Sequence, residues 1–129
     1  MRMLEKDNEV EVEVQAQDQQ DINAFSRYTA RLADLEEELE KAKTEKEYLE
    51  DLATELELAD EDEPVKYRIG DAFVHLSVEE AQASLEKDQE KWDTRVSEYE
   101  TELDSINDKL SSLKSRLYAK FGNAINLEK

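Results

Sequence analysis

Val65–Leu76, with the sequence VKYRIGDAFVHL, has the pattern of a single β-hairpin. Two short runs rich in β-branched and aromatic residues flank Gly70-Asp71, and a glycine in first place suits a type II′ turn between antiparallel strands. On each side lie about forty residues with helical periodicity and almost no glycine or proline. The sequence therefore predicts two long helices joined by one small hairpin.

The composition argues against a globular core. Of 129 residues 40% are charged, and 35 acidic against 17 basic residues give a net charge of −18. Such acidity repels nucleic acid and anionic lipid headgroups. The chain has no cysteine, no signal peptide is visible, and no apolar run approaches the ~20 residues that span a bilayer. We therefore expect a soluble cytosolic or nuclear protein without nucleic-acid or membrane partners.

The segment before the hairpin has the heptad repeat of a coiled coil. Asp18 is the expected N-cap, and Pro64 after the acidic run Asp60–Glu63 is expected to end the helix, which we place at residues 18–58. A repeat of seven sustained over five heptads predicts a left-handed coiled coil. Its two series are Phe25, Leu32, Leu39, Lys46, Ala53 and Tyr28, Leu35, Ala42, Leu49, Leu56.

A second helix is expected at residues 78–120. Ser77 and Glu80 form a capping box at its start, and Gly122 can take the left-handed conformation that ends a helix. Its seam consists of Val78, Leu85, Trp92, Tyr99, Ile106, Leu113 and the companion series Gln82, Gln89, Val96, Leu103, Leu110, Leu117. Because the connection is short, the helices should pair as an antiparallel coiled coil.

Counting outward from the hairpin gives the expected register of the two helices. The count places Leu58 near Val78 and Lys46 near Gln89. Lys46 and Gln89 would then form a polar layer that fixes the register midway, at some cost in stability.

No residue pattern points to catalysis or to a cofactor. His75 is the single histidine and lies in a predicted strand, so it lacks the partners of a metal site. Gly70 and Gly122 are the only glycines, which excludes a glycine-rich phosphate loop. Trp92 and Tyr99 recur at heptad spacing and are assigned to the seam. We expect a protein that is not an enzyme and binds no cofactor or metal.

Two places carry apolar residues that the seam does not use. At the hairpin, the second strand is apolar on both faces, and a lone two-stranded sheet is marginal in water, so an outside surface should cover it. At the far end of the helices, two readings stay open: Phe121 and Ile125 fold back to cap the coil, or this end presents its apolar residues to another molecule. These residues are Ile22, Tyr118, Phe121, Ile125 and Leu127.

Residues 1–16 form an acidic N-terminal segment. Val10, Val12 and Val14 alternate with glutamates, which fits a strand, but the acidity favours a solvated, disordered tail.

Three stretches resemble one known family. They are DQQDINAFSR (Asp18–Arg27), YRIGDAFVHLSVEEAQ (Tyr67–Gln82) and LYAKFGNAINLE (Leu117–Glu128). Together with the order helix, hairpin, helix, they are similar to a β-class prefoldin subunit over residues 17–128. Coiled-coil periodicity alone would not reproduce the hairpin and both end sequences.

The resemblance implies a mainly α fold whose hairpin joins a β-barrel in a hetero-hexamer of two α-class and four β-class subunits. It also implies a chaperone that holds unfolded actin and tubulin at the coiled-coil tips without ATP and passes them to the cytosolic chaperonin. Assembly would use Val65, Tyr67, Ile69, Phe73, Val74 and Leu76. Candidate client contacts are Ile22, Phe25, Tyr118 and Phe121. The alternative is a structural coiled-coil adaptor without chaperone activity.

Overall fold

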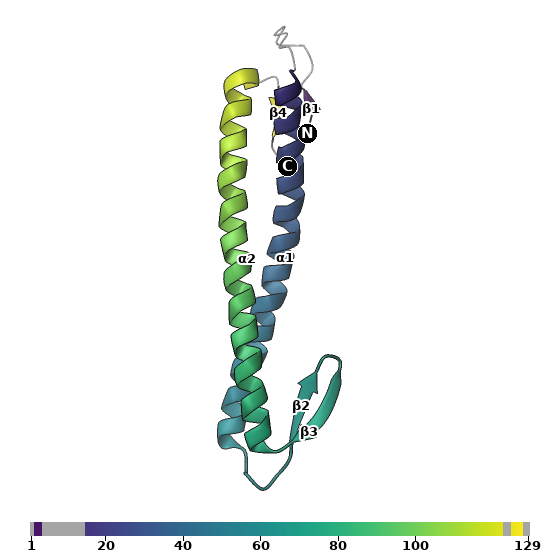
Figure 1. Ribbon diagram of the computed structural model, residues 1–129, viewed down its shortest axis with the longest axis vertical. Coiled ribbons are helices and arrows are strands. Elements are labelled where there is room, and N and C mark those ends of the chain that lie inside the picture. The colour runs from purple at the N-terminus through teal and green to yellow at the C-terminus, as the bar shows by residue number, and fades with distance from the viewer. Residues whose placement is uncertain (1, 4–14, 123–124, 128–129) are drawn as a thin grey trace. The chain divides into compact units, whose positions relative to one another are not determined.

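Two long helices joined by a β-hairpin make up most of the chain (Figure 1). The computed structural model describes residues 2–3, 15–122 and 125–127. The elements are β1 (Arg2–Met3), α1 (Ala16–Leu58), β2 (Val65–Ile69), β3 (Ala72–Leu76), α2 (Val78–Phe121) and β4 (Ile125–Asn126). The mainly helical fold expected from the sequence, with an antiparallel hairpin between the helices, is confirmed.

The hairpin turns over two residues. β2 and β3 pair antiparallel, with Ile69 opposite Ala72 and Tyr67 opposite Val74. Gly70, the first turn residue, has φ of 61°, in the left-handed region that glycine enters without steric cost. The expectation of a glycine-first turn is met at this position.

Local side-chain contacts fix the start of each helix. In α2 the capping box forms in both directions: the Glu80 amide donates to Ser77 Oγ and the Ser77 amide donates to Glu80 Oε1, each at 3.1 Å. In α1 the expectation that Asp18 is the N-cap is wrong. The helix begins at Ala16, and the Asp18 carboxylate accepts a hydrogen bond from the Gln15 amide at 3.0 Å, because a carboxylate in the first turn can reach back to a free amide.

The structure divides into two compact units. The hairpin unit is residues 38–100, and the tip unit is the described part of residues 1–37 and 101–129. Each core contains three residues of the predicted seam, but Leu52 and Ala81 are buried one position before the predicted Ala53 and Gln82, and Gln82 is exposed. The hairpin unit has a core of Leu49, Leu52, Leu56, Tyr67, Ala81 and Leu85, and the tip unit has a core of Phe25, Leu113, Leu117, Phe121 and Leu127.

Within the hairpin unit, the expected register of the two helices fails at the C-terminal end of α1. Leu58 was placed near Val78 but is 85% exposed. Leu56 occupies the last seam position of α1, and Leu58 lies two residues and therefore about 200° further around the helix, so it faces away from α2. Midway, Lys46 forms an ion pair with Asp93 at 3.0 Å and lines a small hollow with Gln89, so a polar layer is present there.

The expected disordered tail falls mostly outside the described residues, which omit 1 and 4–14. Within that segment, Arg2 and Met3 pair antiparallel with Asn126 and Ile125. Among the described residues, no helix is long and apolar enough to cross a membrane.

Candidate functional site

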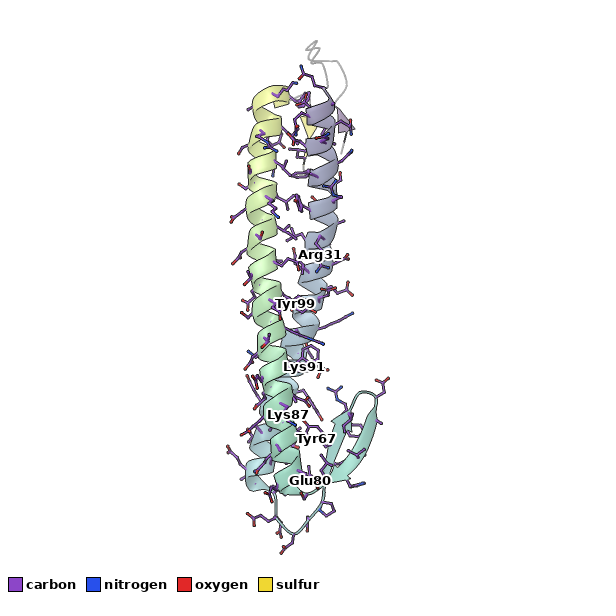
Figure 2. All side chains as sticks on the ribbon, viewed as in Figure 1. Arg31, Tyr67, Glu80, Lys87, Lys91 and Tyr99 are labelled. Atoms are coloured by element: carbon purple, nitrogen blue, oxygen red, sulfur yellow. The ribbon has the colours of Figure 1, made fainter. Side chains whose placement is uncertain are left out.

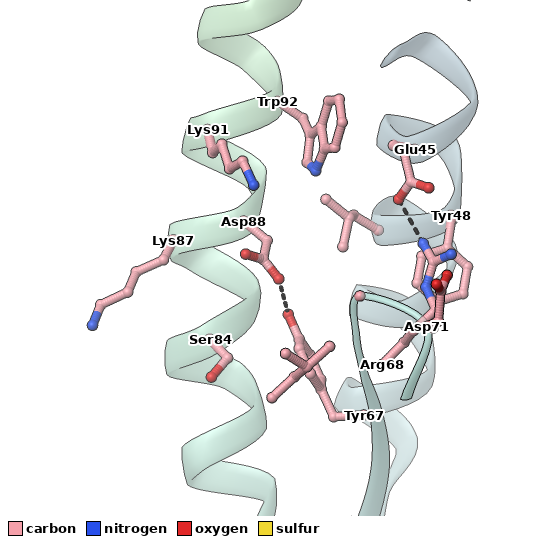
Figure 3. A pocket seen from close by; sticks show the side chains of 13 residues that line it. Glu45, Tyr48, Tyr67, Arg68, Asp71, Ser84, Lys87, Asp88, Lys91 and Trp92 are labelled. Carbon is pink, nitrogen blue, oxygen red and sulfur yellow. Dashed lines mark hydrogen bonds and ion pairs between the residues drawn. The ribbon is translucent and has the colours of Figure 1, made fainter. Parts of the chain in front are cut away.

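Tyr67 fastens the hairpin to the helices of its own unit. Its side chain points from β2 toward α2, and its hydroxyl donates a hydrogen bond to Asp88 Oδ2 at 2.6 Å (Figures 2 and 3). The residue is only 2% exposed. Burial, together with the hydrogen bond to Asp88, raises the pKa of Tyr67 above its usual range. Tyr67, which was expected at a subunit interface, therefore packs inside its own chain.

Arg68 makes a second attachment, to α1. Its guanidinium donates to Glu45 Oε2 at 2.6 Å and lies 4.5 Å from the centre of the Tyr48 ring. Between these two attachments lies a cavity of about 510 Å³ whose apolar wall includes Leu49, Ile69 and Trp92 (Figure 3). The Tyr67 hydroxyl and the Arg68 guanidinium thus both have hydrogen-bond partners on the helices, while the wall of the cavity beside Ile69 is partly apolar.

The hairpin also presents apolar residues to solvent. Ile69 is 57% exposed and Phe73 is 52% exposed, with the Lys66 ammonium 4.8 Å from the Phe73 ring centre. Val65, Val74 and Leu76 are partly buried against the hairpin-unit core. The six residues predicted for assembly therefore divide into four that cover their own helices and two, Ile69 and Phe73, that remain available.

Both strands of the hairpin have an outer edge that is not paired with another described strand. β2 and β3 form a sheet of two strands, so among the described residues each strand has one edge without a neighbouring strand. Such edges are the usual template for adding a strand from another chain. The hairpin thus combines two free edges with two exposed apolar side chains.

In the tip unit, the candidate client residues are placed in two different environments. Phe25 and Phe121 are buried in the core, whereas Ile22 and Tyr118 are partly buried and pack against it. The burial of Phe121 agrees with the fold-back reading for that residue, and Leu127 is buried there too. The side chain of Ile125 lies outside what is described.

In the tip unit, ion pairs also join α1 to α2. Asp18 bonds Lys120, and Asp21 bonds Arg116 at 2.9 Å. The Lys120 ammonium and the Gln15 amide hold the pKa of the Asp18 carboxyl below its usual range. Sequence reasoning missed these pairs. The available signal was acidic residues in the first turns of one helix opposite basic residues in the last turns of its antiparallel partner.

A further ion pair, between Arg31 and Glu102, is bidentate. Arg31, on α1 (Figure 2), donates to both Glu102 oxygens, at 2.8 and 3.1 Å. This contact lowers the pKa of Glu102. Both side chains are close to half exposed, so we expect the pair to contribute little to stability and mainly to favour this alignment of α1 against α2.

His75 is exposed on β3. Within the described residues, no three His, Cys, Asp or Glu side chains are grouped so that they could hold a metal ion.

Known proteins resemble this chain over nearly all of its length. Prefoldin subunit 4 of Saccharomyces cerevisiae is 42% identical over 129 residues, which cover 100% of both chains. Prefoldin subunit 4 of Homo sapiens is 42% identical over 119 residues, 92% of this chain and 89% of that protein. A crystal structure of the prefoldin beta subunit from Thermococcus strain KS-1 has the same fold, with a TM-score of 0.69 and 20% identity over 84% of this chain and 96% of that one. A family model described as prefoldin subunit matches residues 19–124, and the chain therefore belongs to the prefoldin subunit family.

Proposed function

We propose that this chain is a β-class subunit of a hetero-hexameric prefoldin and that it helps to hold unfolded proteins without using ATP. Its prefoldin-type domain would cover residues 17–128, and its partners would be two α-class and three further β-class subunits. The clients would be unfolded actin and tubulin, delivered to the cytosolic chaperonin in the cytoplasm, with a nuclear pool left open. The chain would act by binding, without catalysis.

The hairpin carries this proposal. Its inner face is occupied by its own helices through Tyr67, so the fold of the subunit does not depend on a partner at that face. Its outer side keeps Ile69, Phe73 and two strand edges. Strands from sister subunits would form hydrogen bonds with these edges and bury the two side chains, as in a closed barrel.

Substitution of the two exposed residues tests assembly. Ile69→Ser with Phe73→Ser removes exposed apolar surface and should leave the subunit folded, because neither side chain belongs to a core. After co-expression with partner subunits, native mass spectrometry should show loss of the hexamer. Leu58→Ser, the same kind of change at a leucine that is 85% exposed, is the matched control and should assemble normally. An intact hexamer in the double variant would contradict the assembly role.

The tip unit would supply the client contact. Phe121 is buried, so a Phe121→Ser variant would disturb the core rather than probe a surface. Ile22 and Tyr118 are partly exposed and are the sharper choice. The Ile22→Ser, Tyr118→Ser hexamer should suppress aggregation of a denatured client less well than wild type, with and without ATP. Unchanged suppression would argue against a tip contact by these residues.

The coiled-coil adaptor remains the second candidate. The observation in its favour is that Phe25, Phe121 and Leu127 are buried in the tip core, and no large apolar side chain is exposed among the described residues of that unit. An assembled complex that fails to retard client aggregation under any condition would select the adaptor.

A further inference from the structure

The C-terminal segment folds back onto the apolar core of the tip unit. α2 ends at Phe121, and Gly122 follows with φ of 53°, a left-handed conformation that ends a helix and redirects the chain. β4 then runs extended beside β1 (Figure 1). Leu127, the next residue, is only 4% exposed and belongs to the cluster formed by Phe25, Leu113, Leu117 and Phe121.

The docked segment has the two properties that any unfolded polypeptide can offer. It is extended, and it inserts one branched aliphatic side chain between residues of two helices. Hydrophobic contacts of this kind are not directional, so an aliphatic side chain from another chain can replace Leu127. The surface that Leu127 covers would otherwise be an apolar groove at the end of the helix pair.

The segment is also weakly held by its backbone. Among the described residues, β1 and β4 share two residue pairs, Arg2 with Asn126 and Met3 with Ile125. A two-stranded sheet, and above all one this short, is marginal in water. Burial of the Leu127 side chain therefore supplies much of the free energy that holds the segment in its docked position.

We propose that this groove binds an extended polypeptide segment through a branched aliphatic side chain, and that Leu127 with β4 occupies it when no client is bound. The inference rests on the proposed function and names the chemistry of the client that the tip takes. The chain's own segment then competes with the client, and the apparent client affinity is reduced in proportion to the fraction of molecules whose groove is open.

The ion pairs indicate how the groove opens. Asp18 with Lys120 and Asp21 with Arg116 join the ends of α1 and α2 in the same unit. Neither pair includes Leu127 or a residue of β4, so departure of the C-terminal segment breaks neither of them. Departure of the C-terminal segment, and not separation of the helices, uncovers Phe25 and Leu117.

A leucine substitution tests the competition from one side. In the full-length chain, Leu127→Ser should lower the Kd for a permanently unfolded probe, reduced and carboxymethylated α-lactalbumin, about tenfold, because burial of one leucine shifts an equilibrium by roughly one to two powers of ten. Leu58→Ser is the matched control, since that leucine is 85% exposed in the other unit, and it should leave the Kd unchanged.

A reversible cross-link tests the competition from the other side and does not depend on a destabilising change. Met3 and Ile125 are paired residues of an antiparallel ladder, so cysteines at these two positions would have their Cα atoms within the range that a disulfide spans, and the chain has no cysteine of its own. Oxidised Met3→Cys, Ile125→Cys protein should bind the probe at least about fivefold more weakly than the same protein after reduction. Each single-cysteine variant should bind alike in both redox states.

The outcomes separate the two levels of the proposal. Tighter binding by Leu127→Ser together with weaker binding by the oxidised double-cysteine protein supports the inference. Equal binding by all forms would overturn the inference and leave the proposed function standing. Absence of probe binding in every form would overturn this inference, and the aggregation assay on the assembled hexamer would then decide the proposed function separately.

Discussion

Replacement of Tyr67 by phenylalanine should loosen the hairpin without changing how the ring packs. The tyrosine is 2% exposed, and its hydroxyl lies 2.6 Å from Asp88 Oδ2. Phenylalanine keeps the buried ring and removes only the hydrogen bond. The measured change in the free energy of unfolding therefore reports that bond.

The structure sets the expected magnitude of this change. A hydrogen bond to a charged group contributes about 1.5–3 kcal/mol. Asp88 is partly exposed, so water can solvate its carboxylate once the hydroxyl is gone, and the lower end of this range applies. We expect Tyr67→Phe to lower the free energy of unfolding by about 1.5 kcal/mol, and Tyr67→Ala, which also removes the ring, by about 3–5 kcal/mol.

A double-mutant cycle measures the bond itself. Tyr67→Phe, Asp88→Asn and the double variant are unfolded in urea, and hydrogen exchange follows the amides of β2 and β3. Tyr99→Phe, which removes a hydroxyl from a half-buried seam tyrosine, is the control. A Tyr67–Asp88 coupling energy below about 0.5 kcal/mol would refute the reasoning that this bond fastens the hairpin.

The same bond predicts a dependence on alkaline pH. Because the pKa of Tyr67 is raised in the folded chain, the folded form keeps its proton above pH 10.0, where an ordinary tyrosine loses it. The stability that this group contributes is complete below that pH and falls as the pH rises. The difference in unfolding free energy between wild type and Tyr67→Phe should be constant below about pH 10 and should narrow as the pH rises above it. A constant difference would contradict the assigned role.

Three further predictions concern the turn and the helix ends. Gly70→Ala should lower the free energy of unfolding by about 1 kcal/mol in urea titrations, because φ is 61° and the new Cβ would meet open space, so backbone strain alone acts. An unchanged midpoint would contradict this. Ser77→Ala should cost about 1 kcal/mol and reduce amide protection in the first turn of α2; protection equal to wild type would show that the capping box is dispensable. The pKa of Asp18 is lowered, so its contribution is complete above pH 3.8 and is lost as the pH falls through the folded value. In the acid unfolding of Lys120→Met this component should be smaller, because the Gln15 amide alone then stabilises the carboxylate, and a profile identical to wild type would refute it.

These predictions separate what holds a subunit together from what joins subunits. Tyr67 and Arg68 bind the hairpin to its own helices, whereas Ile69 and Phe73 face outward. Variants of the first pair should lower the stability of the isolated chain. Variants of the second pair should act on assembly alone.

Features set by neighbours in the chain could be predicted from the sequence. The heptad series predicted both helices and most of their buried positions, because a repeat of seven places those side chains on one side of each helix. Ser77 with Glu80 predicted the start of α2, and Gly70 predicted the turn. Each depends on contacts within about four residues along the chain.

Features set by distant residues were decided only by the tertiary structure. No local pattern shows that Tyr67 bonds Asp88, 21 positions away, or that Asp18 pairs with Lys120, 102 positions away. The sequence left open whether Phe121 and Ile125 fold back or whether this end faces another molecule, and packing buried Phe121 together with Leu127. Periodicity determines which side of a helix is apolar. Which segment covers the apolar end of a helix depends on which distant parts of the chain meet there. Their meeting is decided by the balance between apolar burial and chain entropy over the whole fold.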